Sequence, residues 1–228
     1  MATMKGSILG KLRGSVGDFS SRIFKGNNII CNKPASFNTP KDERSVLRRQ
    51  KFAMSSKFTK AVNSIPALKA VWDKLKPADL NTYNFIFQTN YKQLSGSKLT
   101  DLNTITPFFG FPVSAQSVSL ASDNVSVELA PLGASFTLNP EVETNIKLLM
   151  VMYMDEPADS QAGEFYMYPM EFNSVPIQTD QPLTFTRSFD DTEKLIYEKY
   201  GYHKAYFAVV TLDADENPVR FSTTSASE

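Results

Sequence analysis

Residues 118–129 read VSLASDNVSVEL, and apolar side chains recur there at every second position. Val118 and Leu120 alternate with serine, and Val125, Val127 and Leu129 resume the same period after four intervening residues. A period of two is typical of β-strands that bury one face and expose the other. The stretch therefore predicts two half-buried strands and indicates a β-rich second half of the chain.

Further strand candidates follow toward the C-terminus, separated by turn-forming clusters of Asn, Asp and Pro. Seven or eight short strands without long helices between them are typical of an antiparallel β-sandwich. We expect this sandwich domain over residues 117–228, with a short helix over 191–200. The other strand candidates are 136–138, 146–154, 164–172, 183–189, 206–212 and 219–222.

Before residue 100 the apolar side chains recur three and four positions apart, which is the spacing of amphipathic helices. Pro40 suits the first turn of a helix, and Asp42 and Glu43 follow where the helix dipole favours anions. We therefore expect a helical segment over residues 39–100, joined to the sandwich by residues 101–116. Its first helix is expected from 40 to about 61. A second is expected to restart at Ser64 with Pro66, to carry apolar residues from Leu68 to Leu75 and to end at Pro77, and a third is expected from about 78 to 94.

Residues 1–38 are expected to form an arm, because five of the ten glycines lie there and each disfavours a helix by about 1 kcal/mol. Two short apolar runs, 21–24 and 28–31, flank Lys25-Gly26-Asn27. Gly and Asn tolerate positive φ, so this pattern predicts a β-hairpin. The predicted fold class is α+β, with an extended basic N-terminal arm, short helices and an antiparallel β-sandwich.

Charge is divided unevenly along the chain, although its formal net charge is zero. Residues 1–80 contain sixteen Lys and Arg against five Asp and Glu, whereas residues 81–228 contain eight against nineteen. A cationic segment favours an anionic partner, such as nucleic acid, a membrane surface or the acidic half of another copy. Candidate nucleic-acid or subunit contacts are Lys11, Arg13, Arg22, Lys25, Lys41, Arg44, Arg48, Arg49 and Lys51.

A second candidate surface is the run PFFGFP at residues 107–112. Its three phenylalanines, Phe108, Phe109 and Phe111, suit an adhesive loop at an interface, or they fill the joint between two domains. The sequence favours the filled joint, and in either case these are the candidate interface residues.

The residues available for catalysis are few. His203 is the single histidine and Cys31 the single cysteine, so the chain offers neither an internal disulfide nor the ligands of a zinc site. No nucleophile motif accompanies His203, and no phosphate-binding glycine loop occurs. The acidic clusters fall in predicted turns, and the run 213–217 lacks the glycine and terminal glutamate of an EF-hand loop. The sequence therefore predicts no enzyme, no cofactor, no metal and no small-molecule substrate.

Two further features bear on location. The first 30 residues lack the apolar core of a signal peptide, and no apolar run approaches the length of a membrane span. We expect a protein without a membrane span, located in a virion or in the cytoplasm of the host cell.

The amino-terminal motifs resemble an uncharacterised protein family of Bacteroidetes genomes and their phages. The resemblance rests on LGKLRGSVG at residues 9–17, the Phe24-Lys25-Gly26 step and Asn32-Lys33-Pro34. It implies a basic helix followed by an immunoglobulin-like carboxy-terminal domain that ends in a tyrosine-rich and a Ser/Thr-rich strand. Residues 202–210 and 220–225 match this pattern loosely. The family implies no activity.

Together these observations predict a structural protein, a bacteriophage virion component that forms a homo-oligomer or binds other virion proteins through its basic arm. The alternative is a sequence-independent DNA-binding protein that uses the basic half against phosphates. A carbohydrate-binding sandwich is a third class, for which Tyr166, Tyr168 and Tyr202 are candidates.

Overall fold

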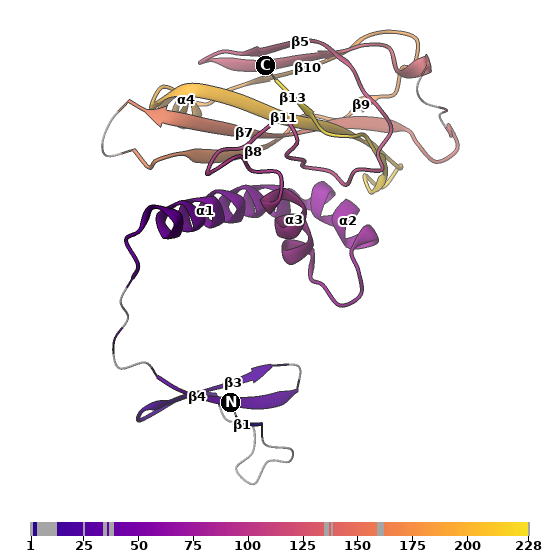
Figure 1. Cartoon of the computed structure of the whole chain (residues 1–228). Helices are drawn as coiled ribbons and strands as arrows, with labels where there is room; N and C mark the ends of the chain where they lie inside the picture. The colour runs from indigo at the N-terminus through magenta and orange to yellow at the C-terminus, as the bar shows by residue number, and fades with distance from the viewer. Residues whose placement is uncertain are drawn as a thin grey trace. The chain divides into compact units, whose positions relative to one another are not determined.

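The computed structural model describes residues 2–3, 13–24, 26–33, 36, 39–134, 137, 139–158 and 162–227. It combines helices with antiparallel sheets, so the predicted α+β class is confirmed. The chain divides into two compact units, residues 1–43 and residues 44–228. Figure 1 shows the elements of both.

The N-terminal unit contains a four-stranded antiparallel sheet in the order β1-β4-β3-β2. The expected hairpin is present, with Phe24 opposite Asn27 and Gly26 in the turn at a φ of 79°. The sequence predicted only this hairpin, because the flanking strands are short and lie in glycine-rich sequence without alternation. The strands are β1 (Ala2–Thr3), β2 (Gly14–Val16), β3 (Phe19–Phe24) and β4 (Asn27–Asn32).

Three helices follow: α1 (Glu43–Ser64), α2 (Pro66–Leu75) and α3 (Thr82–Tyr91). Pro40 precedes α1 instead of opening it, so this helix begins three residues later than expected. The third helix is shorter than expected because the Asn81 side chain caps it, accepting a hydrogen bond from the N–H of Asn84 at 2.7 Å. In the part of the chain that the structure describes, no helix has the length and apolar content to cross a membrane.

The remaining residues build two sheets, in which most predicted strands are present. The larger sheet has the order β12-β11-β7-β8, with β13 also on β11 and β9 on β7, and the smaller has the order β10-β6-β5. The short helix α4 (Asp191–Tyr197) is confirmed and begins with a capping box formed by Asp190 and Glu193. The candidate strand 136–138 falls largely outside the described residues. The strands are β5 (Ala115–Leu120), β6 (Asn124–Leu129), β7 (Asn145–Pro157), β8 (Tyr166–Glu171), β9 (Val175–Pro176), β10 (Leu183–Ser188), β11 (Tyr200–Leu212), β12 (Pro218–Phe221) and β13 (Ser225–Ala226).

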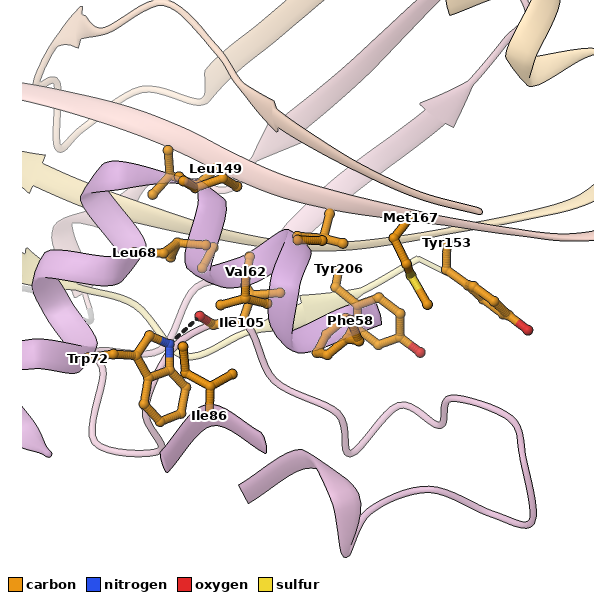
Figure 2. Close-up of a cluster of buried hydrophobic side chains, with 14 of the residues drawn as sticks. Phe58, Val62, Leu68, Trp72, Ile86, Ile105, Leu149, Tyr153, Met167 and Tyr206 are labelled. Atoms are coloured by element: carbon orange, nitrogen blue, oxygen red, sulfur yellow. Dashed lines mark hydrogen bonds between the residues drawn. The ribbon is translucent and has the colours of Figure 1, made fainter. Parts of the chain in front are cut away.

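The larger sheet is the middle of three layers, with the helices on one face and the smaller sheet on the other (Figure 1). On the helical side Phe58 packs against Tyr206, with ring centroids 5.4 Å apart, and Leu68, Trp72 and Leu149 belong to the same buried cluster (Figure 2). On the opposite side, residues of β6 and β10 pack against the alternate residues of β7 and β11. A strand buried on both faces carries a continuous apolar run, which explains the sequence IKLLMVMYM at residues 146–154.

The expected joint, residues 101–116, is in part a buried connection. The indole N–H of Trp72 donates to the carbonyl of Ile105 at 2.8 Å (Figure 2), and the Thr106 hydroxyl donates to the Ser222 carbonyl at 2.8 Å. These bonds join the helices to the C-terminal residues. The helical segment and the sandwich segment, which the sequence distinguished, therefore belong to one compact unit.

Candidate functional site

A groove of about 810 Å³ lies between β5 and the beginning of β11. Val118 and Leu120 line it from β5, and His203 and Phe207 line it from β11. Ser225 of β13 also contributes. The groove thus runs along the opening between the two sheets, and strand backbones form much of its wall.

Alternate residues of β5 turn their backbone hydrogen-bonding groups away from β6, and one of these groups, the Leu120 carbonyl, accepts from the Tyr197 hydroxyl at 3.0 Å. The N–H of Ala121 donates to the Asn124 carbonyl at 2.9 Å, and hydrogen-bonded pairs alternate with non-bonded pairs along an antiparallel ladder. Ser117 and Ser119 therefore bond to β6. The N–H and C=O groups of Val118 and Leu120 point the other way, and among the described strands none pairs with them.

The opposite wall also has a strand edge. Residues 200–212 of β11 pair with β7 along one side, but on the other side β12 and β13 reach only from Leu212 back to Tyr206. The Ser227 N–H extends this pairing by one bond, to the Ala205 carbonyl at 2.8 Å. Within the described residues, no strand covers Gly201 and His203 on the groove side.

His203 and Tyr197 both line the groove. Their rings stack with centroids 3.7 Å apart, and His203 Nε2 lies 3.0 Å from the Tyr197 carbonyl oxygen. The Tyr197 hydroxyl donates to the Leu120 carbonyl at 3.0 Å, which connects α4 to the end of β5. Burial lowers the pKa of His203 and raises the pKa of Tyr197, so both are neutral at pH 7.

The structure describes seven of the nine candidate basic residues. Lys11 and Lys25 lie outside the described residues. Arg13, Arg22 and Lys41 are exposed in the N-terminal unit. The remaining four belong to α1, where Arg44, Arg48 and Arg49 are exposed and Lys51 is half-buried.

The ammonium group of Lys51 makes contacts within the protein. Its Nζ donates to the Leu94 carbonyl at 3.1 Å and lies 5.0 Å from the centroid of the Tyr91 ring. Arg48 donates to the Ser45 hydroxyl at 2.9 Å and remains on the surface. Arg44 and Arg48 are therefore exposed on the surface of α1, whereas Lys51 holds α1 against the end of α3.

The sequence favoured a phenylalanine run, residues 107–112, that fills the joint between two domains. In the structure, two of its three phenylalanine side chains are exposed instead. Phe108 is 56% exposed and Phe109 is 89% exposed, while Phe111 is half-buried. The Phe111 backbone bonds to both neighbours of Ser222: its N–H donates to the Phe221 carbonyl at 3.1 Å, and its carbonyl accepts from the Thr223 N–H at 2.9 Å. This anchoring holds the loop to the sheet and leaves the two preceding phenylalanine side chains in solvent.

The tyrosines considered for carbohydrate binding are divided between two places. Tyr166 stacks on Tyr168 and Tyr200, and the Tyr168 hydroxyl donates to Glu193. Tyr202 is 41% exposed and packs against Tyr153 on the larger sheet. In the described part of the chain, no group of three or more His, Cys, Asp and Glu side chains could hold a metal ion.

Comparison with known proteins adds nothing to this geometry. No family model and no curated protein matches the sequence. Among solved structures, a β-glucosidase from Kluyveromyces marxianus shares 8% identity with a TM-score of 0.24, and the match covers 61% of this chain and 16% of that chain. A TM-score this low carries no argument about fold or activity.

The groove was not identified from the sequence. Its one visible signal is the stretch AQSVSL at residues 115–120, which lacks both charge and proline. That composition is ordinary for an internal strand and unusual for an edge strand, so it became informative only once the strand order was known.

Proposed function

We propose that this protein is a non-enzymatic structural or assembly protein, a bacteriophage virion component, whose N-terminal unit joins one copy to another. The observation that carries the proposal is that the described side chains of residues 13–42 are exposed or only half-buried. None of the described side chains in this range is buried, although the range contains most of a four-stranded sheet. Covering an apolar face would add to the stability of so small a sheet, and a second copy would supply that cover.

Apolar side chains lie on both faces of this sheet, with Phe24 and Ile29 on one face and three more on the other. Residues directly opposite in register share a face, so Phe19, Ile23 and Ile30 lie together. Phe19 is 52% exposed, and the two isoleucines are only half-buried. Covering such a face releases about 25 cal/mol for each Å² of apolar surface removed from water.

Charge favours a second copy as the partner. Residues 1–43 contain seven Lys and Arg against three Asp and Glu, whereas residues 115–228 contain six against eighteen. Opposite potentials on the two surfaces favour encounter and set the orientation of docking. A contact between different parts of two copies is head-to-tail, which generates closed rings or open filaments.

The immunoglobulin-like character of the carboxy-terminal part belongs to the same proposal. The order β5-β6-β10 follows strands A, B and E of immunoglobulin domains, and β12-β11-β7-β8 follows strands G, F, C and C′. All neighbouring pairs in these two orders are antiparallel. This strand order supports the expectation drawn from the family resemblance.

The test is the mass of the full-length protein in solution, measured by native mass spectrometry over a range of concentrations. We expect a discrete oligomer that the double substitution Phe19→Asp with Ile23→Asp dissociates. Ser20→Asp with Asn27→Asp is the control, since it adds the same charge at exposed positions on the other face. A wild-type chain that stays monomeric at every concentration would contradict the proposal, and absence of the protein from purified phage particles would contradict its location in the virion.

A specific observation also favours the alternative, sequence-independent DNA binding. Residues 44–80 contain nine Lys and Arg against two Asp and Glu, and Arg44 and Arg48 are exposed on α1. Binding to a random duplex would then weaken steeply with salt, and Arg44→Gln with Arg48→Gln would reduce the slope by about 2. Fluorescence anisotropy at several salt concentrations measures both effects.

A further inference from the structure

We infer that the pocket between α1 and the outer edge of β8 binds a small organic acid, a carboxylate attached to an apolar body, which goes beyond the proposed assembly function. The pocket has a volume of about 360 Å³, and two lysines of α1 face an apolar stretch of chain at β8 across it. Small-molecule sites have volumes of about 300–1,000 Å³ and combine apolar walls with a few polar groups that orient the ligand.

The α1 side of the pocket is basic. Lys57 and Lys60 both line it and both are exposed, and residues three positions apart lie on the same face of a helix. Neither lysine forms an ion pair with an Asp or Glu in the part of the chain that the structure describes. Like charges at this spacing repel each other, so an anion between the two ammonium groups is favoured.

One of these charges is already held at the pocket. The Lys57 Nζ lies 4.2 Å from the centroid of the Phe165 ring and donates to the Phe165 carbonyl at 3.5 Å. Phe165 immediately precedes β8 and lines the same pocket. The ring and the carbonyl both attract a cation, so they fix the ammonium group where α1 meets β8. A charge that is positioned in advance reduces the ordering cost of binding.

The β8 side of the pocket is apolar. Met167 is 9% exposed and belongs to the buried cluster on the helical face of the larger sheet, on the same side as Phe58 (Figure 2). Pro169 continues this wall along β8, and Ala61 adds to it from α1. Such a wall suits a hydrocarbon chain or an aromatic ring. It does not suit a phosphate group, whose oxygens would lose hydration against it without gaining partners.

The backbone of β8 adds a hydrogen-bond donor at the same edge. The Phe172 N–H donates to the Leu148 carbonyl at 3.0 Å, and bonded pairs alternate along an antiparallel ladder. The N–H of Met167 therefore points away from β7, and no described strand pairs with that side of β8. A carboxylate accepts hydrogen bonds from N–H and ammonium groups alike, and those that involve a charge are the stronger ones.

The same edge disfavours an extended peptide as the ligand. Pro169 occupies the next outward position after Met167 and has no N–H group. The edge therefore lacks the continuous row of donors that an added strand would use, because proline interrupts it. A single donor beside two ammonium groups matches one carboxylate, and the volume of the pocket leaves room for its apolar body.

The first experiment compares three probes on the full-length protein, whose methionine methyl groups are labelled with ¹³C for NMR. 4-Phenylbutyrate carries both the carboxylate and the apolar body, 4-phenylbutyramide lacks the charge, and acetate lacks the body. We expect 4-phenylbutyrate to shift the Met167 methyl resonance saturably and to bind at least tenfold more tightly than the other two. Met170 is the internal control, since it belongs to the buried cluster on the opposite face of the larger sheet and should not shift. Met167→Leu assigns the resonance.

The second experiment removes the charges. Lys57→Gln with Lys60→Gln should weaken 4-phenylbutyrate binding at least tenfold and leave 4-phenylbutyramide binding unchanged. The matched control is Arg44→Gln with Arg48→Gln, which removes two exposed charges from the same helix. Arg48 lies nine residues before Lys57, or about 14 Å along the helix axis, which is beyond the Debye length of about 8 Å at physiological salt. This control should bind as the wild type does.

A third variant separates charge from packing by the lysine stems. Lys57→Arg with Lys60→Arg keeps both positive charges, so we expect affinity within about threefold of the wild type. Thermal unfolding verifies that each variant is folded. The inference is overturned by equal binding of the acid and its amide, by equal binding of acetate, by unchanged affinity in the glutamine variant, or by no saturable shift of the Met167 methyl up to about 10 mM 4-phenylbutyrate.

These outcomes are independent of assembly. A chain that binds 4-phenylbutyrate in this way but stays monomeric supports the carboxylate site and contradicts the proposed assembly function. An oligomer that fails the probe comparison removes the site and leaves the assembly function standing.

Discussion

Glu143 is a buried carboxylate whose partners come from three different parts of the body. It is 2% exposed and accepts hydrogen bonds from the Thr211 hydroxyl at 2.7 Å and from the Asn139 N–H at 2.9 Å. The Nε–H of the Arg220 guanidinium also donates to the Glu143 carboxylate, at 2.8 Å. Burial acts to raise the pKa of Glu143, but the hydrogen bonds from Arg220, Thr211 and Asn139 outweigh it and lower the pKa.

Replacing this carboxylate should destabilise the body. We expect Glu143→Gln to lower the free energy of unfolding by about 2 kcal/mol, because hydrogen bonds to a charged group are stronger than those to an amide. Urea unfolding measures the change. The control is Glu171→Gln, which removes an exposed carboxylate paired with Lys147 at 3.6 Å and should change stability by less than about 1 kcal/mol.

The lowered pKa also predicts a pH dependence with a definite sign. The folded state holds the Glu143 carboxylate ionised at a lower pH than the unfolded chain does. Its contribution is therefore complete above the ordinary carboxyl pKa of about 4.3 and disappears as the pH falls through the lower, folded-state value. The stability difference between wild type and Glu143→Gln should shrink in acid. A difference that stays constant from pH 7 to pH 3 would contradict this assignment.

Asn90 has a similar role at the end of α3. Its Oδ1 accepts from the Thr104 N–H at 2.8 Å, and its Nδ2 donates to the carbonyls of Ile86 and Thr104. Asn90→Leu would leave the buried groups of Thr104 without partners, and we expect a loss of about 3 kcal/mol. Chemical denaturation tests this against Gln88→Leu, at an exposed position on the same helix, which should be nearly neutral. Equal effects of the two substitutions would show that the Asn90 bonds contribute little.

Among the elements, the β3–β4 hairpin depends most directly on one backbone conformation. Gly26 occupies the turn at a φ of 79°, in the left-handed region that costs about 1–2 kcal/mol for other residues. Gly26→Val should therefore reduce hydrogen-exchange protection of residues 19–32 and, through loss of the sheet, weaken assembly. Gly163→Ala is a suitable control, since its nearest neighbours lie at 3.8 Å and its φ is not positive. Unchanged protection in Gly26→Val would contradict the importance of this turn.

At the scale of the whole molecule, the uneven division of charge predicts how assembly responds to salt. If residues 1–43 of one copy meet the acidic residues of another, added salt screens the attraction, because the Debye length falls from about 10 Å at 0.1 M to about 3 Å at 1 M. The dissociation constant of the oligomer should rise between 50 mM and 500 mM NaCl. Sedimentation velocity measures it, and a constant or decreasing value would show that apolar contacts alone hold the copies together.

Period and local chemistry were sufficient for most of the longer elements of this protein, whereas the short strands β1, β2, β9 and β13 carried no such signal. Alternation at 118–129 and the helical spacing before residue 100 indicated the α+β class, and Gly26 and Pro77 indicated the hairpin turn and the end of the second helix region. These features are local, since each depends on residues close together in the chain. The start of α1 was misplaced because Pro40 is compatible with both a first helical turn and the residues before it.

The tertiary structure decided everything that depends on which strands become neighbours. The burial of Ile105 against Trp72, the exposure of Phe109 and the unpaired edge of β5 follow from strand order and layer packing, which bring together residues more than 30 and in places more than 80 positions apart. Sequence spacing determines which face of an element is apolar, because that is a property of the backbone period. It does not determine what covers that face or which edge stays open, because these depend on non-local contacts whose free energy is shared across the whole body.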